Sequence, residues 1–299
     1  MTLKQLDAFF CAATCASFAV AAERLHLSLS SLSKRIAELE QSLGENLFDR
    51  SGHRAVLTPA GARLLPHAAE VLQSAERLVL ALGKDSGLTG RCRFGVGELA
   101  ALTWLPSLLA QACEAFPRLV LEPYVDIGTV LEQRVSDGEL DFAVVAGRSS
   151  RSAVLSQPVG EAHFLWVASP ALVGATRVLS AELLSAQPLI TLHLGAGTTR
   201  LLDDWLGAQP VSAERRLTCN GWGAVAGMLV DGVGVGFLPE GWAHALSRRG
   251  QLSILDSQPA LSPLHYTFQS RRDDTRLMVL KLREMVGRVA DFSATSGLF

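Results

Sequence analysis

The sequence predicts a multidomain protein: an all-α-rich N-terminal module, one long helix and a larger α/β domain. Three observations predict this order. Within the first 58 residues, serines precede short apolar stretches at helical spacing. An apolar stripe then continues at helical spacing over about three heptads. Beyond residue 90, apolar strands alternate with helical patterns, which is typical of a parallel sheet covered by helices.

The first module contains two predicted helices separated by a very short turn. Ser17 is placed to cap the first helix, and Ser28 is placed to cap a longer one that ends at Gly44. Only His26 and Leu27 lie between the two helices, so the helices must cross steeply. This pattern predicts a helix-turn-helix whose second helix can enter a major groove of DNA.

The second helix and a predicted hairpin wing behind it carry the candidate DNA contacts. Residues 1–58 form this first domain, and its wing turns at Ser51-Gly52. Hydroxyl, ammonium and guanidinium groups on these elements suit contacts with bases and phosphates. The candidates are Ser28, Ser30, Ser31, Ser33, Lys34, Arg35, Arg50, His53 and Arg54.

With those residues in view, the segment resembles the N-terminal winged helix-turn-helix of LysR-type transcriptional regulators. The similarity begins near Leu3 with LKQLDAFF, runs through SFAVAAERLHLS and LSKRIAELEQSLGENLFDR, and continues into LTPAGARLLPHA. It implies a homo-oligomeric regulator that binds a double-stranded DNA operator. Leu29 departs from the family pattern, which usually has glutamine there. Leucine can either turn into the core or touch a thymine methyl group, and both readings stay open.

The long helix is expected to join two copies of the chain. Thr58-Pro59 starts a helix that continues to about residue 82. Its apolar stripe consists of Leu64, Leu65, Ala68, Val71, Leu72, Ala75, Leu78, Val79 and Leu82. Such a stripe favours a homodimer through residues 59–82, antiparallel in the resembling family, with packing on its own chain as the alternative. A tetramer stays open, and an activator would also contact RNA polymerase.

A polar, glycine-rich hinge is predicted at 83–90, and the α/β domain follows at 91–299. The resemblance is carried here by LPSLLAQACEAFP, GELDFAVV and DGVGVGFLP. It implies a two-lobed, periplasmic-binding-protein-like effector domain. Residues 91–160 and 265–299 would form its first lobe, and 161–264 its second.

Ligands of open α/β sheets collect at the carboxyl ends of strands and at helix N-termini, which predicts a small-molecule effector between the lobes. The candidate effector-binding residues are Gly97, Glu98, Leu99, Ala100, Thr129, Gly147, Arg148, Thr198, Thr199, Arg200 and Trp222. The threonines could instead cap their helices, and Trp222 could simply pack. Glu98 favours a cationic effector and the two arginines favour a carboxylate, so the charge of the ligand stays open.

The remaining patterns argue against an enzyme. Gly95 to Ala100 matches a dinucleotide-binding G-x-G-x-x-A turn, but the acidic residue expected about 20 positions later at a strand end is missing. A nicotinamide-dependent oxidoreductase is therefore the disfavoured alternative. No nucleophile elbow, HExxH or phosphate loop occurs in the sequence. We expect no enzymatic activity and no cofactor.

Charge and cysteine content narrow the class further. The net charge of -2 excludes a polycationic, non-specific nucleic-acid binder. The five cysteines are scattered, so we expect no metal site, although a redox role for Cys11 and Cys15 stays open. No signal peptide or apolar run of membrane length is readable, which predicts a cytoplasmic protein.

Overall fold

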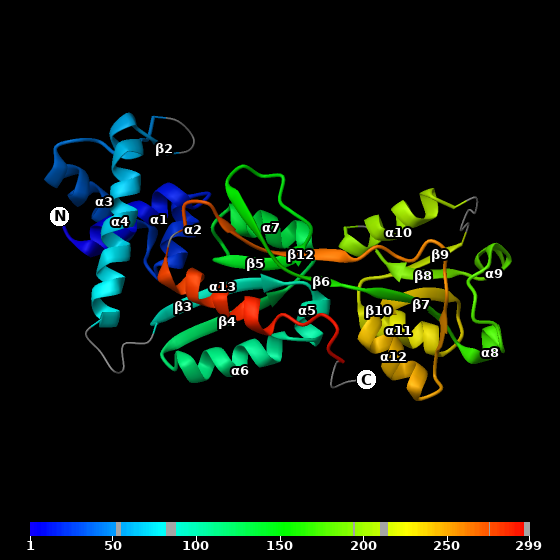
Figure 1. Cartoon of the computed structure of the whole chain (residues 1–299). Helices are drawn as coiled ribbons and strands as arrows, with labels where there is room; N and C mark the ends of the chain where they lie inside the picture. Colours follow the sequence, from blue (N-terminus) through cyan, green and yellow to red (C-terminus); the bar gives the residue numbers. More distant parts are fainter. Residues whose placement is uncertain (52–54, 82–87, 194, 210–214, 275, 296–299) are drawn as a thin grey trace.

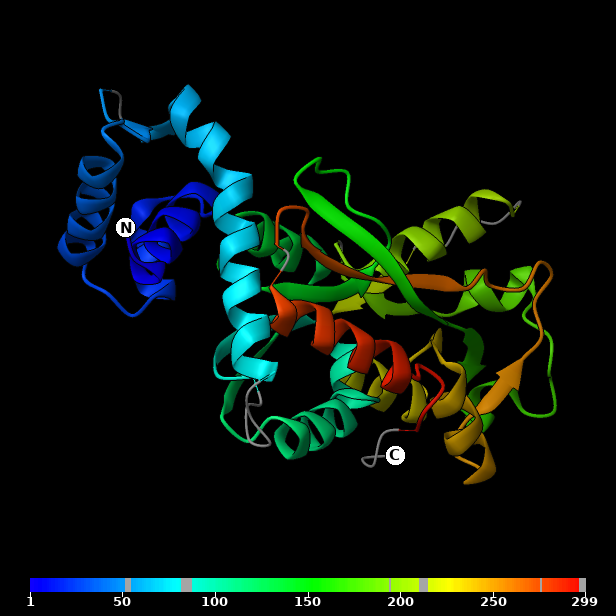
Figure 2. The same cartoon turned by 60° about the vertical axis from the view of Figure 1, so that its left-hand side comes forward.

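Three parts follow one another in space as they do along the chain (Figure 1). The structure is a computed structural model that describes residues 1–51, 55–81, 88–193, 195–209, 215–274 and 276–295. A helical module comes first, and the long helix α4 (Pro59–Ala81) follows it. In Figure 2, α4 stands between the module and two α/β lobes.

The helical module forms as its local signals predict. Its elements are α1 (Leu3–Thr14), α2 (Phe18–Arg24), α3 (Leu29–Leu43), β1 (Phe48–Asp49) and β2 (Val56–Leu57). Ser17 Oγ accepts the Val20 amide at 3.2 Å, Ser28 Oγ accepts the Ser31 amide at 3.1 Å, and Gly44 ends α3 in the left-handed conformation. The predicted caps are therefore present. Apolar side chains of α1 and α3 meet in the core of the module: Leu6, Phe9, Leu32, Ile36 and Leu39.

The apolar stripe of α4 is divided between two surroundings. Thr58 Oγ1 accepts the Gly61 amide at 3.1 Å, so the predicted N-cap is formed. Ala68 is buried in the core of the helical module, and Leu72 packs against that core. Val71 and Leu78 are 43% and 64% exposed. Part of the stripe thus packs on its own chain, as the alternative reading held, and part remains on the surface.

The first lobe is a five-stranded sheet between two layers of helices. Its strand order is β4 (Leu119–Val125), β3 (Gly90–Val96), β5 (Phe142–Ala146), β12 (Leu264–Arg271) and β6 (Val154–Ala162). On one side lie α5 (Glu98–Leu102), α6 (Leu105–Ala115) and α13 (Leu277–Val289), and on the other lies α7 (Gly128–Ser136).

The second lobe repeats this plan. Its strand order is β11 (Ser253–Leu255), β7 (Phe164–Ala168), β10 (Val235–Pro239), β8 (Leu189–Leu192) and β9 (Arg216–Cys219). Its helices are α8 (Pro170–Val173), α9 (Ala181–Ala186), α10 (Gly197–Gly207), α11 (Trp222–Val230) and α12 (Glu240–Arg248). The strands β6 and β12 connect the two lobes (Figure 1).

The structure corrects the expectation of a parallel sheet. In the first lobe β3 pairs in parallel with β4 and β5, but β12 is antiparallel to both β5 and β6. In the second lobe β7 is antiparallel to β10 and β11. Helix–strand alternation indicates parallel neighbours only for consecutive strands joined by a helix. It does not reveal a strand such as β12, which returns from the other lobe.

Some boundaries also differ from those predicted. Gly90 begins β3 instead of ending the hinge, and β6 continues to Ala162. The short helices α5, α8 and α9 were not predicted. No helix in the described segments is long and apolar enough to cross a membrane.

Candidate functional site

The predicted DNA-reading face lies on α3, on the side of the helical module that points away from the lobes (Figures 1 and 2). Ser28, Ser30, Ser31 and Lys34 are exposed, whereas Ser33 and Arg35 are half-buried. Ser28 Oγ contacts Ser30 Oγ at 2.9 Å and donates to Ser31 Oγ at 2.8 Å. The start of α3 therefore presents a linked group of hydroxyls, with Lys34 one turn further along the helix.

Leu29 lies on the surface, with 52% of its area exposed. The inward-facing reading of this residue is therefore wrong. An exposed leucine at the first position of α3 is free to make an apolar contact such as that with a thymine methyl group.

The wing is attached to α3 by a residue that the sequence reading missed. Glu40 Oε1 accepts the amides of Leu47 and Phe48, at 2.8 and 3.2 Å. Glu40 Oε2 pairs with Arg50 at 3.3 Å, and the Arg50 guanidinium lies 5.9 Å from the Phe18 ring centroid. Arg50 is thus exposed but already paired within the module. His53 and Arg54 lie outside the described residues.

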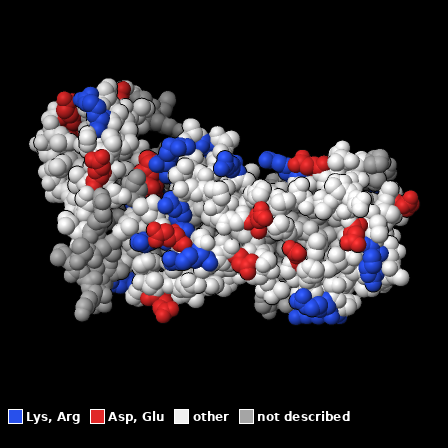
Figure 3. Space-filling view, viewed as in Figure 1, with Lys and Arg blue, Asp and Glu red and all other residues white. Residues whose placement is uncertain are grey.

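Charge alone does not mark this region. Residues 1–60 hold six basic and six acidic side chains. In Figure 3, blue and red side chains are interspersed over the visible face, without an extended basic surface. Any sequence-specific contact must therefore come from the placement of individual side chains, because bulk attraction to phosphates is weak.

A cavity of about 850 Å³ lies between the two lobes. Ten of the eleven candidate effector-binding residues line it: Gly97, Glu98, Leu99, Thr129, Gly147, Arg148, Thr198, Thr199, Arg200 and Trp222. Ala100 is the exception, because it is fully buried in the hydrophobic core. Residues that the sequence reading did not select also line the cavity, among them Asp126, Glu132, His193, Asn220 and Tyr266.

The two threonines at the start of α10 do not cap it. The N-cap position of α10 is Ala196, which forms no side-chain cap. Thr199 Oγ1 donates to the His193 carbonyl at 2.9 Å. Thr198 is 3% exposed, and its Oγ1 has no hydrogen-bond partner among the described residues. A buried hydroxyl without a partner costs about 1–3 kcal/mol, so Thr198 offers an unused polar group beside the cavity.

Glu98 connects the two lobes across this cavity. Its carboxylate oxygens accept the Trp222 amide at 3.0 and 2.9 Å, at the N-terminus of α11. A carboxylate is favoured there by the helix dipole and by the free amide groups. Trp222 is 3% exposed and stacks on Phe164, with ring centroids 5.9 Å apart. Trp222 therefore packs within the second lobe and also borders the cavity.

Positive charge is available at the opening of the cavity. Arg148 and Arg200 are both exposed, and neither forms an ion pair with another described residue. By contrast, Glu132 pairs with Arg151 at 3.3 Å and Asp203 pairs with Arg216 at 2.9 Å. Two carboxylates of the lining also form no ion pair with a described residue. Glu98 accepts the Trp222 amide, and Asp126 Oδ1 accepts the adjacent Ile127 amide at 2.7 Å.

The first glycine of the dinucleotide-like turn, Gly95, has a structural explanation. Gly95 lies inside β3, and a Cβ atom there would come within 2.5 Å of Leu131 Cδ2. Gly95 therefore allows α7 to pack on the strand. The following helix, α5, is only five residues long. This arrangement differs from a strand–turn–helix that binds a pyrophosphate.

The cysteines lie away from the interlobe cavity. All five are free, and none lines that cavity. Burial raises the pKa of Cys11 to about 12 and raises the pKa of Cys92 well above its ordinary value. These two thiols are therefore poor nucleophiles at neutral pH. The described residues contain no group of three potential metal ligands.

Comparison with known proteins gives consistent results over both regions. Residues 3–62 match the family described as "Bacterial regulatory helix-turn-helix protein, lysR family", and residues 85–291 match "LysR substrate binding domain". A "Probable hydrogen peroxide-inducible genes activator" from Mycobacterium avium is 32% identical over 257 residues, which cover 85% of this chain and 82% of the relative.

Solved structures with the same fold cover nearly the whole chain. A mutant of Corynebacterium glutamicum OxyR with H2O2 bound is 26% identical, with a TM-score of 0.58, covering 97% of this chain and 94% of that one. ArgP from Mycobacterium tuberculosis superposes with a TM-score of 0.65 at 21% identity over 98% of both chains, which shows a shared fold.

Proposed function

The chain belongs to the LysR-type transcriptional regulators, DNA-binding proteins with a substrate-binding domain, and from this premise we propose how its parts divide the work. Residues 1–58 read DNA, 59–82 pair two subunits, 83–90 form a hinge, and 91–299 bind an effector. Such a protein acts where the DNA is, in the cytoplasm, and has no enzymatic activity of its own. If it is an activator, it also contacts RNA polymerase.

We propose that α3 enters the major groove and that Lys34 and the exposed serines make its contacts. The observation that carries this proposal is the exposed row of Ser30, Ser31 and Lys34 on a capped helix that faces away from the lobes. Arg50 and the wing residues His53 and Arg54 would contact phosphates on either side. Arg50 would have to exchange Glu40 for a phosphate.

A charge reversal tests this face. An operator is first selected from a random-sequence DNA library with the wild-type protein. The variant K34E/R35E should lose at least 100-fold in affinity for that operator, because each cation is replaced by an anion beside phosphates. The matched control is K281E/R288E on α13, which reverses two exposed cations of the first lobe and so makes the same charge change. Equal affinities for K34E/R35E and K281E/R288E would contradict the proposal.

We propose that the exposed part of the α4 stripe is the dimer contact. Val71 and Leu78 lie on the surface at 43% and 64% exposure, two turns apart on one helix. Apolar residues at this spacing suit a helix-to-helix seam with a second copy. Two subunits joined in this way would present two recognition helices to an operator with two half-sites, and pairs of dimers could form a tetramer.

We propose that a small molecule binds non-covalently in the interlobe cavity. Its volume of about 850 Å³ is in the range of ligand sites. Thr198 Oγ1 supplies a buried, unpartnered hydroxyl, and Arg148 and Arg200 supply unpaired positive charge. This combination favours a ligand that carries a hydrogen-bonding group and an anionic group, so we favour a carboxylate over a cation.

Sensing of peroxide by a thiol in this cavity is the alternative suggested by the names of the relatives. Such sensing needs a reactive thiolate, whereas the described lining of the cavity contains no cysteine. A peroxide response of this chain would have to use Cys15, Cys113 or Cys219, which are at least partly exposed.

Two threonines provide a matched test of the effector site. A panel of metabolic carboxylates is screened for a rise in the thermal midpoint of the full chain, with H2O2 as a separate sample. For a carboxylate that raises the midpoint, T198V should weaken binding about tenfold, since one hydrogen bond is lost. T191V is the control, because Thr191 Oγ1 is also buried and unpartnered but does not line the cavity. Equal effects of both variants, or a response to H2O2 alone, would contradict the proposal.

A further inference from the structure

The DNA-binding module is held on the first lobe mainly by polar contacts. Among the described residues, the hydrophobic core of the module and the core of the two lobes share no member. A cavity of about 490 Å³ lies at the junction, lined by residues of α1, α4 and the first lobe, including Phe10, Leu72 and Met278. The junction is therefore not closed by a continuous apolar core.

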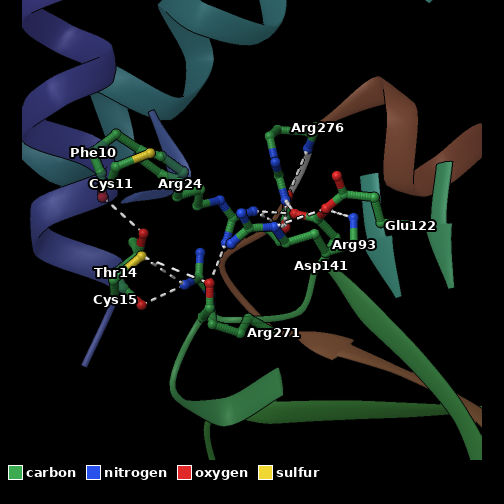
Figure 4. Close-up of polar contacts among 12 residues, drawn as sticks. Phe10, Cys11, Thr14, Cys15, Arg24, Arg93, Glu122, Asp141, Arg271 and Arg276 are labelled. Carbon is green, nitrogen blue, oxygen red and sulfur yellow. Dashed lines mark hydrogen bonds and ion pairs between the residues drawn. The ribbon is translucent and has the colours of Figure 1, made fainter. Parts of the chain in front are cut away.

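The centre of the junction is Asp141, a 5% exposed carboxylate just before β5 (Figure 4). It pairs with Arg24 of α2, accepts Arg276 Nη2 at 2.6 Å, and accepts the Arg93 amide at 2.8 Å. Arg276 also pairs with Asp274. In Figure 4, the Arg24 side chain extends from the helical module into this group.

The two buried carboxylates of this group, Asp141 and Asp274, are matched by two partly buried arginines, Arg24 and Arg276. Burial acts to raise the pKa of the Asp141 carboxyl, but the guanidinium groups of Arg276 and Arg24 outweigh burial and hold that pKa below its ordinary value. The same balance lowers the pKa of Asp274 to about 2. If Arg24 were absent, Asp141 and Asp274 would have one guanidinium partner fewer. The group on the first lobe therefore provides a preformed acceptor for a cation of the module.

Further contacts surround the Arg24 pair. Arg24 Nη1 donates to the Gly138 carbonyl at 2.9 Å, and the Ala16 amide donates to the Asp137 carbonyl at 2.8 Å. Arg271 donates to the Thr14 carbonyl. Gly138 has a φ of +75°, and a Cβ atom there would lie 2.9 Å from Cys15 Sγ, so the two backbones approach closely. In addition, Glu23 pairs with Arg93 at 3.1 Å.

Three strands of the first lobe run from this junction to the effector cavity. β3 carries Arg91 and Arg93 at the junction and ends just before Glu98 at the effector cavity. β5 begins after Asp141 at the junction and ends just before Gly147 at the cavity. β12 runs the opposite way, from the cavity to Arg271. The recognition helix α3 stays free on the far side of the module.

We propose that Arg24 clamps the DNA-binding module to the first lobe, so that the module and this lobe move as one body. Displacement of the first lobe, when an effector moves the two lobes, then also displaces the recognition helix. A polar junction next to a cavity can open without unfolding either part, so loss of the Arg24 contacts should release the module while both parts stay folded. This inference rests on the proposed function for its consequence, but the clamp itself is testable without DNA or effector.

Hydrogen–deuterium exchange of the full chain tests the clamp directly. The variant R24Q should accelerate exchange of the Ala16 amide at least tenfold, because that amide is protected only when the module is docked. Exchange of the amides of Ile36 in α3 and Phe237 in β10 should stay within twofold of wild type. The matched control is R63Q on α4, since Arg63 is exposed and forms no ion pair with the described residues. Unchanged exchange at Ala16 in R24Q would overturn the clamp.

A milder variant covers the case in which R24Q loosens the whole chain. R24K keeps the positive charge but loses the two-pronged guanidinium. If R24Q accelerates exchange everywhere, R24K should still accelerate Ala16 selectively, by about threefold or more. No selective acceleration in R24K would then overturn the proposal.

A separate experiment tests whether the clamp fixes the position of the recognition helix. A library that carries two copies of the selected half-site with spacers of different lengths is offered to the wild type and to R24Q. The wild type should enrich a narrow set of spacers, and R24Q should lower that preference at least fivefold while still binding DNA. Identical spacer preferences would overturn the one-body motion. Loss of DNA binding by wild type would instead refute the proposed function and leave the exchange result standing.

Discussion

The replacement of Asp141 by asparagine should destabilise the α/β domain far more than loss of an ordinary surface charge. Three donors converge on the Asp141 carboxylate: the guanidinium groups of Arg24 and Arg276 and the amide of Arg93. Hydrogen bonds to a charged group contribute about 1.5–3 kcal/mol each, and asparagine keeps only one acceptor oxygen. Removal of one partner from a buried ion pair costs about 3–5 kcal/mol. We therefore expect D141N to lower the free energy of unfolding by about 3–5 kcal/mol.

Urea unfolding at pH 7 measures this loss with two probes. All five tryptophans lie between residues 104 and 242, so their fluorescence reports the α/β part alone. Far-UV circular dichroism reports both parts, and each transition is analysed separately because the chain is multidomain. The control is D203N, which breaks the exposed pair of Asp203 with Arg216 and should cost at most about 1 kcal/mol. A D141N protein no less stable than D203N would refute the reasoning.

Three further predictions follow from single features. V71E/L78E should turn the proposed dimer into a monomer at micromolar concentration in light scattering, because charges would enter the proposed helix-to-helix seam. S74E, on an exposed position of the same helix, should not. A dimeric V71E/L78E protein would exclude this seam. H26G should raise the free energy of unfolding of the helical module by about 0.5–1 kcal/mol, since His26 has a left-handed φ of 53° that glycine adopts without strain; a lower thermal midpoint would contradict this. The folded-state pKa of Asp274 is lowered to about 2 from 3.8. Its ionised form therefore contributes about 2 kcal/mol to the free energy of unfolding above pH 4, and this contribution is lost as the pH falls toward 2. An acid titration of D274N should lack this loss of stability.

Local signals explain why the helical module was predictable. The caps at Ser17 and Ser28 and the stop at Gly44 act within a few residues of their own helices, so the sequence alone reveals them. The candidate cleft residues could also be predicted from the sequence, because loops at the carboxyl ends of parallel strands come together at one edge of a sheet. Ala100 was misassigned because the first turn of a helix has an inner face as well as an outer one.

Contacts between distant residues were not predictable in this way. The anchoring of the wing by Glu40 could not be separated from an ordinary solvent-exposed glutamate, since its acceptor role depends on where the wing folds back. The antiparallel place of β12 depends on a return from the other lobe. Leu29 could be read in either direction until the rotation of α3 was known.

The sequence by itself determined the family and the order of the helical module, the long helix and the α/β domain. Helix caps, apolar periodicity and short motifs each depend on residues that are neighbours in the sequence. It also indicated which strand ends would line the cavity between the lobes. Only the tertiary structure decided which groups have partners. Thr198 Oγ1 has none among the described residues, Glu98 bridges the lobes, and Arg24 meets Asp141 across 117 positions of sequence. Burial and pairing energies depend on distances between side chains, and those distances exist only once the chain has folded.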